Sequence, residues 1–184
     1  MPVTIIILAA GASRRLGHPK QLVKIDGETL LARAHRIASA VAPTIVVTRQ
    51  EFAFGNALIN EHPDEGMASS IRLGVQSCDG DVLLMTCDQP HVTSEHLRAL
   101  IAAHAPIAAT AYAGIAGVPA FFAHEFRNEL LALHGDIGAR SIIEAHRDVV
   151  VTIPLPEAEF DVDVECGGHA AAAPQRQHGR RTRH

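Results

Sequence analysis

The chain has 184 residues, 47% of them apolar and 20% charged, which is the composition of an ordinary globular domain. Its 16 lysine and arginine residues are outnumbered by 20 aspartate and glutamate residues, giving a formal net charge of −4. This balance argues against broad binding to nucleic acid, which relies on basic side chains to neutralise phosphates. No apolar run approaches the roughly 18 residues of a membrane span, so we expect no membrane insertion either.

Cysteine usage and the N-terminal segment indicate a cytoplasmic protein. The chain has three cysteines, an odd number, and they are widely spaced, at Cys78, Cys87 and Cys166. This pattern fits neither a disulfide framework nor a metal site. The apolar run near the N-terminus is short, follows no basic segment and continues directly into a polar loop, so it does not fit a secretory signal. We therefore expect free thiols and a cytoplasmic location.

The C-terminal 18 residues differ in composition from the rest of the chain. All 20 acidic residues lie before residue 166, whereas four of the 16 basic residues lie in 167–184, so residues 1–166 carry a net charge of −8. The segment 167–184 contains no large apolar residue that could anchor it to a core. We expect one domain over 1–166, followed by a disordered basic tail over 167–184.

The first predicted element is a strand over 3–8, a β-branched run of the kind that a parallel sheet covers on both faces. It leads into the loop LAAGASRRLGHPK, residues 8–20. The small residues at the start of this loop let a ligand reach backbone N–H groups. Arg15 offers a planar fork for phosphate oxygens, and Lys20 offers a mobile point charge. The loop therefore predicts a binding site for a triphosphate.

Two common phosphate-binding loops fail on spacing. A P-loop has four residues between its glycines and Ser or Thr after its lysine, whereas here five residues separate Gly11 from Gly17 and Gln21 follows Lys20. The dinucleotide-binding fingerprint needs a glycine at the position of Ser13. Both are excluded.

The rest of the chain alternates between helical and extended patterns. In chain order we predict a turn at Asp26-Gly27, a helix over 30–41, a strand over 44–48, a helix over 69–76 and a strand over 82–86. Then follow a helix capped by Ser94, strands over 107–112 and 118–122, helices over 125–133 and 139–145, and a strand over 149–153. This order predicts a three-layer α/β/α, Rossmann-like fold with a mostly parallel sheet.

Two further segments carry candidate ligand-binding residues. A polar loop runs into the predicted helix 69–76, where the N–H groups of a helix start could hold an anionic or carbonyl-bearing ligand near Ser70. The alternative is that Ser69 only caps the helix. Asp88 follows the strand 82–86, where its carboxylate can hold Mg²⁺ at the edge of the sheet. Its alternative is an Asx-type turn before Pro90.

A second metal ligand is expected near the C-terminal end of the domain. In the alternating segment Phe160-Asp161-Val162-Asp163-Val164, both aspartates face the same side. The twelve histidines are scattered without ligand spacing, so they add no further metal site.

The loop after the first strand resembles that of the nucleotidyltransferases, and most closely that of the molybdenum-cofactor cytidylyltransferases. Their pattern LAAGxSxRxGxxK is matched at every specified position, by Leu8, Ala9, Ala10, Gly11, Ser13, Arg15, Gly17 and Lys20. The similarity extends over about residues 3–164 and includes the Asp-Gln-Pro segment at Asp88 and a Gly-Met…Ser-Ser segment before the second helix. After Asp163 the chain departs from the family pattern.

The resemblance implies roles for particular residues. Leu8, Ala9, Ala10, Gly11, Ser13, Arg15 and Lys20 would bind the nucleoside triphosphate, with Ser70 beside its base. Asp88 would contact the nucleotide through Mg²⁺, with Asp163 as the second metal ligand, while Arg15, Lys20 and Asp88 would be catalytic. The segment Gly135-Asp136-Ile137-Gly138-Ala139-Arg140 resembles the acceptor side of these enzymes, so Asp136 and Arg140 would face the acceptor. The alternative for Asp136 is a helix cap.

The activity implied by the resemblance is a Mg²⁺-dependent transfer of a nucleoside monophosphate to a phosphate-bearing acceptor, with release of pyrophosphate. In the cofactor enzymes the alanine at Ala10 tends to accompany CTP rather than GTP, so the expected product is a cytidylylated molybdopterin. A molybdoenzyme or a chaperone would then be a partner. A sugar or polyol phosphate as acceptor, and a nucleotide-binding regulatory module without turnover, are the alternatives.

Overall fold

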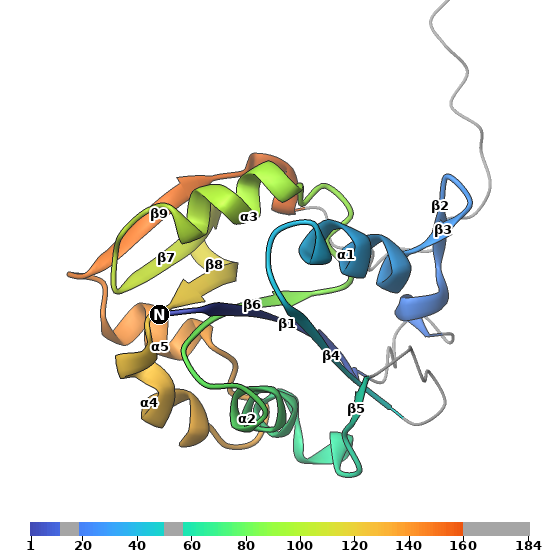
Figure 1. Cartoon of the computed structure of the whole chain (residues 1–184), viewed down its shortest axis with the longest axis horizontal. Coiled ribbons are helices and arrows are strands. Elements are labelled where there is room, and N and C mark those ends of the chain that lie inside the picture. The colour runs from blue at the N-terminus through green and yellow to red at the C-terminus, as the bar shows by residue number, and fades with distance from the viewer. Residues whose placement is uncertain (12–18, 50–56, 160–184) are drawn as a thin grey trace, which may run out of the picture.

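A seven-stranded sheet crosses the molecule, with helices on both of its faces (Figure 1). The computed structural model describes residues 1–11, 19–49 and 57–159. The strands are β1 (Val3–Ala9), β2 (Lys24–Ile25), β3 (Glu28–Thr29), β4 (Thr44–Thr48), β5 (Leu58–Ile59), β6 (Asp81–Thr86), β7 (Ile107–Tyr112), β8 (Ile115–Phe122) and β9 (Val150–Pro154). The α-helices are α1 (Leu30–Ser39), α2 (Met67–Gln76), α3 (Ser94–Ile101), α4 (Arg127–Leu131) and α5 (Arg140–Ala145). Short 3-10 helices are η1 (Lys20–Leu22), η3 (Pro63–Glu65), η4 (His124–Phe126) and η5 (Pro156–Glu159).

The strand order in the sheet is β5-β4-β1-β6-β8-β7-β9. Neighbouring strands run parallel except at β8, which is antiparallel to both β6 and β7. The mostly parallel sheet between two helical layers confirms the predicted α/β class. A separate hairpin, β2 and β3, closes through Asp26 and Gly27, whose positive φ angles of 53° and 83° suit a tight two-residue hairpin turn.

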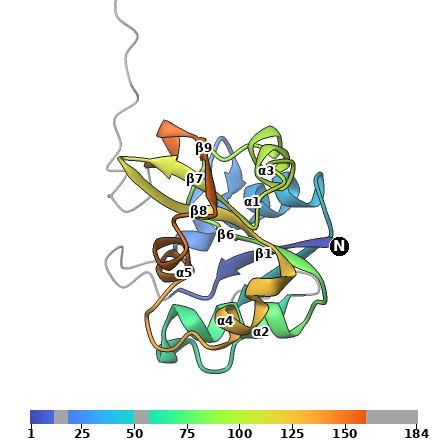
Figure 2. The same ribbon diagram turned by 90° about the vertical axis from the view of Figure 1, so that its left-hand side faces the viewer.

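β1 is covered on both faces because alternate side chains along a strand point in opposite directions. Ile5 and Ile7 pack in the layer of α1 and α3, whereas Ile6 and Leu8 pack in the layer of α2, α4 and α5 (Figures 1 and 2). Each of these four side chains is at most 8% exposed. Full burial of one such side chain contributes about 1.5–3 kcal/mol. The uninterrupted apolar run is therefore what this central strand requires.

The start of α3 differs from the prediction because Ser94 bonds to another element. Thr93 is the N-cap, since its Oγ1 accepts a hydrogen bond from the His96 amide at 3.2 Å. Ser94 Oγ instead donates to the carbonyl oxygen of Ile37 in α1 at 3.0 Å. The prediction of Ser94 as the cap was wrong by one residue, and its hydroxyl ties α3 to α1.

Other element boundaries also differ from the predicted ones. α2 begins two residues earlier than predicted, and β8 begins at Ile115 rather than at residue 118. The helix predicted over 125–133 is divided into η4 and the five-residue α4. The longest described helices, α1 and α2, have 10 residues each, and within the described ranges no helix is long and apolar enough to cross a membrane.

A buried histidine connects α3 to the β7–β8 pair. His96 Nε2 lies 2.9 Å from Thr110 Oγ1, and this hydroxyl donates to the carbonyl oxygen of Pro119 at 2.6 Å. Because the only proton of Thr110 is used in that bond, His96 Nε2 must be the donor, which a neutral imidazole can supply. Burial lowers the pKa of His96 below its usual value of 6.5.

We predict that His96 makes the stability of the fold sensitive to acid. The unfolded chain binds a proton at this histidine more readily than the folded chain, so the free energy of unfolding falls as the pH drops below about 6.5. His96→Gln keeps a donor for Thr110 at a cost of about 1 kcal/mol at neutral pH, and it removes this titration. Chemical denaturation between pH 7.5 and 5 should give a shallower pH dependence for the variant, and equal slopes would contradict the prediction.

Candidate functional site

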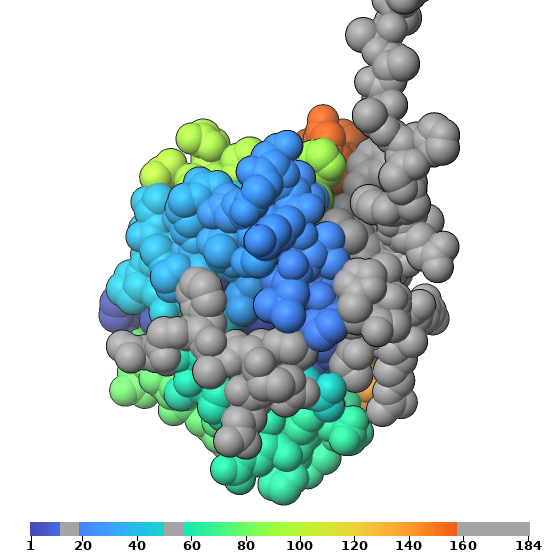
Figure 3. Space-filling model, turned by 90° about the vertical axis from the view of Figure 1, so that its right-hand side faces the viewer, coloured from blue at the N-terminus to red at the C-terminus, as the bar shows by residue number. Residues whose placement is uncertain are grey.

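A pocket of about 420 Å³ lies where β1 and β6 end, at the carboxyl edge of the parallel strands. Figure 3 views this side of the molecule, with the blue segment that includes α1, β2 and β3 above and the green segment of η3 and α2 below. The pocket is lined by Leu8, Ala9, Ala10, Gly11, Lys20, Gln21, Pro63, Asp64, Gly66, Met67, Ser70, Thr86, Cys87, Asp88 and Asp136. Residues far apart in the sequence therefore meet at one sheet edge.

The pocket brings together most of the residues that the sequence singled out. The predicted residues that line it are Leu8, Ala9, Ala10, Gly11, Lys20, Ser70, Asp88 and Asp136. Ser13, Arg15 and Asp163 lie outside the described residues. Arg140 borders a different pocket beside the β7–β8 hairpin, where its Nε donates to Glu144 at 2.7 Å. The structure thus separates Arg140 from Asp136, and their roles toward an acceptor stay predictions.

An ion pair crosses the pocket. Lys20 Nζ, at the start of η1, lies 3.3 Å from Asp88 Oδ2, which follows β6. The two side chains are only 17% and 21% exposed, so each helps to fix the position of the other. Lys20 is also the only cation among the described residues that line the pocket. The pair places an ammonium group and a carboxylate side by side, which suits a site for phosphates and a hard metal ion.

The loop that carries Asp88 is held from two sides. Gln89, which is 7% exposed, accepts from Thr86 Oγ1 at 3.3 Å and donates to the carbonyl oxygen of Val118 in β8 at 3.0 Å. From α1, Arg33 Nε donates to the carbonyl oxygen of Pro90 at 3.0 Å. These bonds keep the backbone beside Asp88 in one place. Among the described residues, the Asp88 carboxylate makes no side-chain hydrogen bond of an Asx turn, and its partner is Lys20.

Gln21 is a site residue that sequence reasoning missed. Its side chain is 2% exposed, and its Nε2 donates to the carbonyl oxygens of Ala9 at 2.6 Å and Gly11 at 3.0 Å. These two bonds fix the junction between β1 and its loop on both sides of Ala10. Within the described part of the chain, Gln21 Oε1 has no hydrogen-bond partner. Such a buried unpaired acceptor costs about 1–3 kcal/mol, and a ligand that donates to it would remove that cost.

Ser69 does not cap α2, contrary to the alternative drawn from the sequence. The N-cap residue is Gly66, and Ser69 Oγ donates to the Gly66 carbonyl oxygen at 2.8 Å. Both Ser69 and Ser70 accept hydrogen bonds from the Nδ2 of Asn60, at 2.8 and 2.9 Å. Asn60 thus joins the segment after β5 to the first turn of α2, which is the side of the pocket that Ser70 lines.

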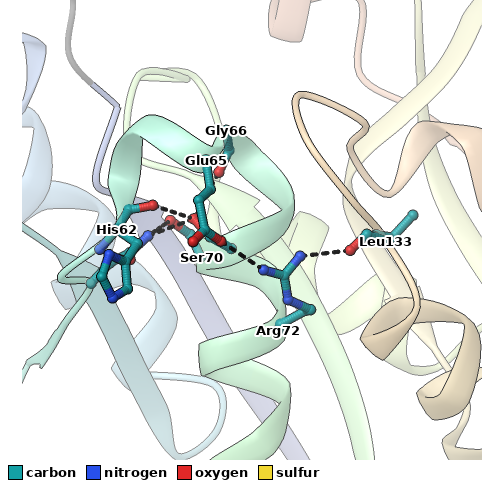
Figure 4. Close-up of polar contacts among 8 residues, drawn as sticks. His62, Glu65, Gly66, Ser70, Arg72 and Leu133 are labelled. Atoms are coloured by element: carbon teal, nitrogen blue, oxygen red, sulfur yellow. Dashed lines mark hydrogen bonds and ion pairs between the residues drawn. The ribbon is translucent and has the colours of Figure 1, made fainter.

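The loop 133–138 packs directly against the N-terminus of α2. The Ala68 amide donates to the carbonyl oxygen of Gly135 at 3.1 Å. Arg72 donates to the carbonyl oxygen of Leu133 at 2.7 Å and to the Glu65 carboxylate at 3.1 Å (Figure 4). These contacts bring Asp136 to the pocket. The N-cap of α5 is Ala139, which has no side-chain cap bond, so the alternative of Asp136 as that cap was wrong.

Two observations limit the chemistry of the site. Burial, with a smaller contribution from the Asp88 carboxylate, raises the pKa of Cys87 to about 12, so its thiol stays protonated and is a poor nucleophile. Within residues 1–11, 19–49 and 57–159, no group of three or more His, Cys, Asp or Glu side chains could hold a metal ion. Among the described residues, Asp88 would therefore hold a metal only together with ligands from a substrate, from water or from residues outside the described ranges.

We predict that Gly66→Ala strongly destabilises the pocket. Gly66 has a φ of +96°, and an added Cβ would lie 2.4 Å from the carbonyl atoms of Gly135. Gly114 is a matched control, because its φ is +74° but nothing lies within 4 Å of an added Cβ. Gly114→Ala should lose about 1 kcal/mol from its positive φ alone. Gly66→Ala should lose about 1–3 kcal/mol more, from the clash and from a ψ of −176° that with a positive φ essentially only glycine adopts. Equal losses in denaturant unfolding would disprove this tight junction.

A family model matches most of the chain: residues 5–149 match the MobA-like NTP transferase domain. A probable molybdenum cofactor guanylyltransferase from Synechococcus elongatus is 31% identical over 110 residues, which are 54% of this chain and 57% of that protein. The match thus spans little more than half of that relative. The purine catabolism protein PucB of Bacillus subtilis is 27% identical over 164 residues, covering 76% of this chain and 80% of that protein.

A solved structure gives the same architecture. The manganese complex of Rv0371C from Mycobacterium tuberculosis H37Rv superimposes with a TM-score of 0.68 and 25% sequence identity, over 85% of this chain and 89% of that one. The cyanobacterial relative is named for guanylyl rather than cytidylyl transfer. The predicted preference for CTP therefore finds no support in these comparisons.

Proposed function

Because the chain belongs to the family of MobA-like NTP transferase domains, we propose that it transfers a nucleoside monophosphate from a triphosphate to a phosphate-bearing acceptor. The observation that carries this proposal is the Lys20–Asp88 pair beside the small-residue end of β1. It joins a cation for phosphate oxygens to a carboxylate for a metal ion within one pocket. Gly11 is exposed at the end of this strand, which leaves room for a ligand to approach the backbone.

In the proposed reaction, a terminal phosphate oxygen of the acceptor attacks the α-phosphorus of the triphosphate. A new P–O bond forms, the bond from the α-phosphorus to its bridging oxygen breaks, and that oxygen leaves with the pyrophosphate. Lys20 would neutralise phosphate charge, and the backbone N–H groups after β1 would orient the triphosphate. No covalent enzyme intermediate is needed, which agrees with the protonated thiol of Cys87.

Asp88 is the described residue best suited to hold Mg²⁺. Its carboxylate supplies the hard oxygen that Mg²⁺ prefers, and Mg²⁺ commonly binds through one or two carboxylates together with substrate phosphates and waters. When bound, the ion would neutralise charge on the phosphates. The manganese complex of the mycobacterial relative supports a divalent metal in proteins of this fold. We propose Asp163 as the second ligand, and it lies outside the described residues.

For the nucleotide we propose GTP, on the strength of the guanylyltransferase named among the relatives. The same name supports molybdopterin as the acceptor. One sequence feature favours CTP instead, since Ala10 stands where the resemblance associates alanine with cytidylyl transfer. GTP and CTP are therefore the two nucleotides to compare first.

The decisive test measures pyrophosphate release with Mg²⁺, molybdopterin, and GTP, CTP, UTP or ATP in turn. We expect release that needs both the metal and the acceptor and is fastest with GTP. Faster release with CTP would assign the protein to cytidylyl transfer. If all four nucleotides bind in calorimetry but none turns over, even with sugar and polyol phosphates as acceptors, the proposed activity is wrong.

We predict that Asp88→Asn lowers the turnover number by about a hundredfold or more, because the neutral amide cannot balance the metal charge near the reacting phosphates. Cys87→Ala, one residue away, is the control and should retain turnover within about threefold, since the thiol takes no part in the reaction. Steady-state pyrophosphate release, with circular dichroism to verify folding, measures both. A folded Asp88→Asn variant with near-normal turnover would remove Asp88 from the mechanism.

A further inference from the structure

The pocket wall formed by α2 contains a polar network in which the geometry fixes the donor and the acceptor of each hydrogen bond. Asn60 is 6% exposed, and its Oδ1 accepts a hydrogen bond from the backbone amide of His62 at 2.9 Å. An N–H group can only donate, so this contact identifies the Asn60 oxygen and fixes the orientation of the amide. The Nδ2 must then be the donor to Ser69 and Ser70, at 2.8 and 2.9 Å.

The two serines use their protons differently. Ser69 Oγ donates to the carbonyl oxygen of Gly66 at 2.8 Å, so its proton is used inside the protein. Ser70 Oγ accepts from Asn60, and no described residue accepts the Ser70 proton. Ser70 is 6% exposed and lines the pocket. Its proton is therefore available to a ligand in the pocket.

The charges on this side of the pocket indicate which part of a nucleotide Ser70 would meet. Asp136 lines the pocket and would repel phosphate, while Asp64, which also lines it, pairs with Arg49 at 3.6 Å. Lys20, the one cation among the described lining residues, belongs to η1. The Ala68 amide in the first turn of α2 already donates to Gly135, which leaves one N–H group fewer for an anion. A hydroxyl donates to phosphate and carbonyl oxygens alike, but beside the Asp136 carboxylate an anionic phosphate is repelled and a neutral carbonyl oxygen is not.

We propose that Asn60 is a positioning residue that keeps the Ser70 proton directed into the pocket, where it is donated to a carbonyl oxygen of the nucleotide base. This inference rests on the proposed function, because it requires a nucleoside triphosphate in the pocket. The Asn60 amide donates a hydrogen bond to the Ser70 hydroxyl oxygen. The Ser70 proton is then available for donation to the ligand. An acceptor at residue 60 would claim that proton instead.

Asn60→Asp tests this directly, because a carboxylate of nearly the same shape can only accept from Ser70. The KM for GTP should rise on the order of tenfold, the loss expected for one hydrogen bond, while kcat stays within about twofold. Ser70→Ala should raise KM by a similar factor. Ser69→Ala is the matched control, which should leave KM within about twofold since its proton never reaches the pocket.

The double variant Asn60→Asp/Ser70→Ala decides whether the asparagine acts through the serine. We expect its KM to equal that of Ser70→Ala alone. A further tenfold rise would mean that Asn60 acts on the fold or on the ligand by itself, and would overturn the proposal. An unchanged KM in a folded Asn60→Asp variant would also overturn it.

A change in the ligand gives a second readout that does not depend on how Asn60→Asp folds. The triphosphate of 2-aminopurine riboside lacks the carbonyl oxygen of guanine together with its N1–H, so wild-type protein should bind it at least about tenfold more weakly than GTP in calorimetry. Ser70→Ala should reduce this preference by about tenfold, because the contact to the carbonyl oxygen is lost. Wild-type protein that binds no nucleotide would refute the proposed function itself, whereas normal GTP binding with the same preference in Ser70→Ala would refute this inference alone.

Discussion

The burial of β1 on both faces is the constraint on which the rest of the structure depends. Ile5 and Ile7 are held by one helical layer and Ile6 and Leu8 by the other, so the strand cannot shift its register without exposing apolar side chains. Its end therefore lies at a fixed place beside the end of β6, with which it pairs from Val3 to Leu8. The small residues of the loop and the Asp88 carboxylate meet because these two strands end together.

Three buried amide side chains then fix the segments around the pocket. Gln21 binds the carbonyl groups at the end of β1, Gln89 connects the Asp88 loop to β8, and Asn60 joins the segment after β5 to α2. An amide is suited to this task because it both donates and accepts while carrying no charge, so its burial costs less than that of an ion. The charged groups, Lys20 and Asp88, remain partly exposed and face the pocket.

Close packing supplies the remaining wall. The positive φ of Gly66 and its contact with Gly135 let the backbone of the loop 133–138 approach α2 more closely than any side chain would permit. Arg72 reinforces this junction by binding the Leu133 carbonyl group. As a result Asp136, 70 residues after Gly66, lies in the same pocket as the N-terminus of α2.

The sequence by itself determined the fold class, the central strand and most of the pocket residues. A strand covered on both faces must be apolar throughout, and a ligand-binding loop at its end must be small and cationic, so both leave local patterns. Only the tertiary structure decided that Thr93 rather than Ser94 caps α3 and that Arg140 and Asp136 border different pockets. It also decided that Gln21 lines the candidate pocket and that Asn60 binds Ser70 in its wall. The bonds of Ser94 to α1, of Gln21 to the end of β1 and of Asn60 to α2 join separate segments of the chain, and no local spacing records which partner a polar side chain will meet. The Thr93 cap is a local bond, but the adjacent Ser94 offers the same kind of hydroxyl, so the local pattern does not distinguish the two.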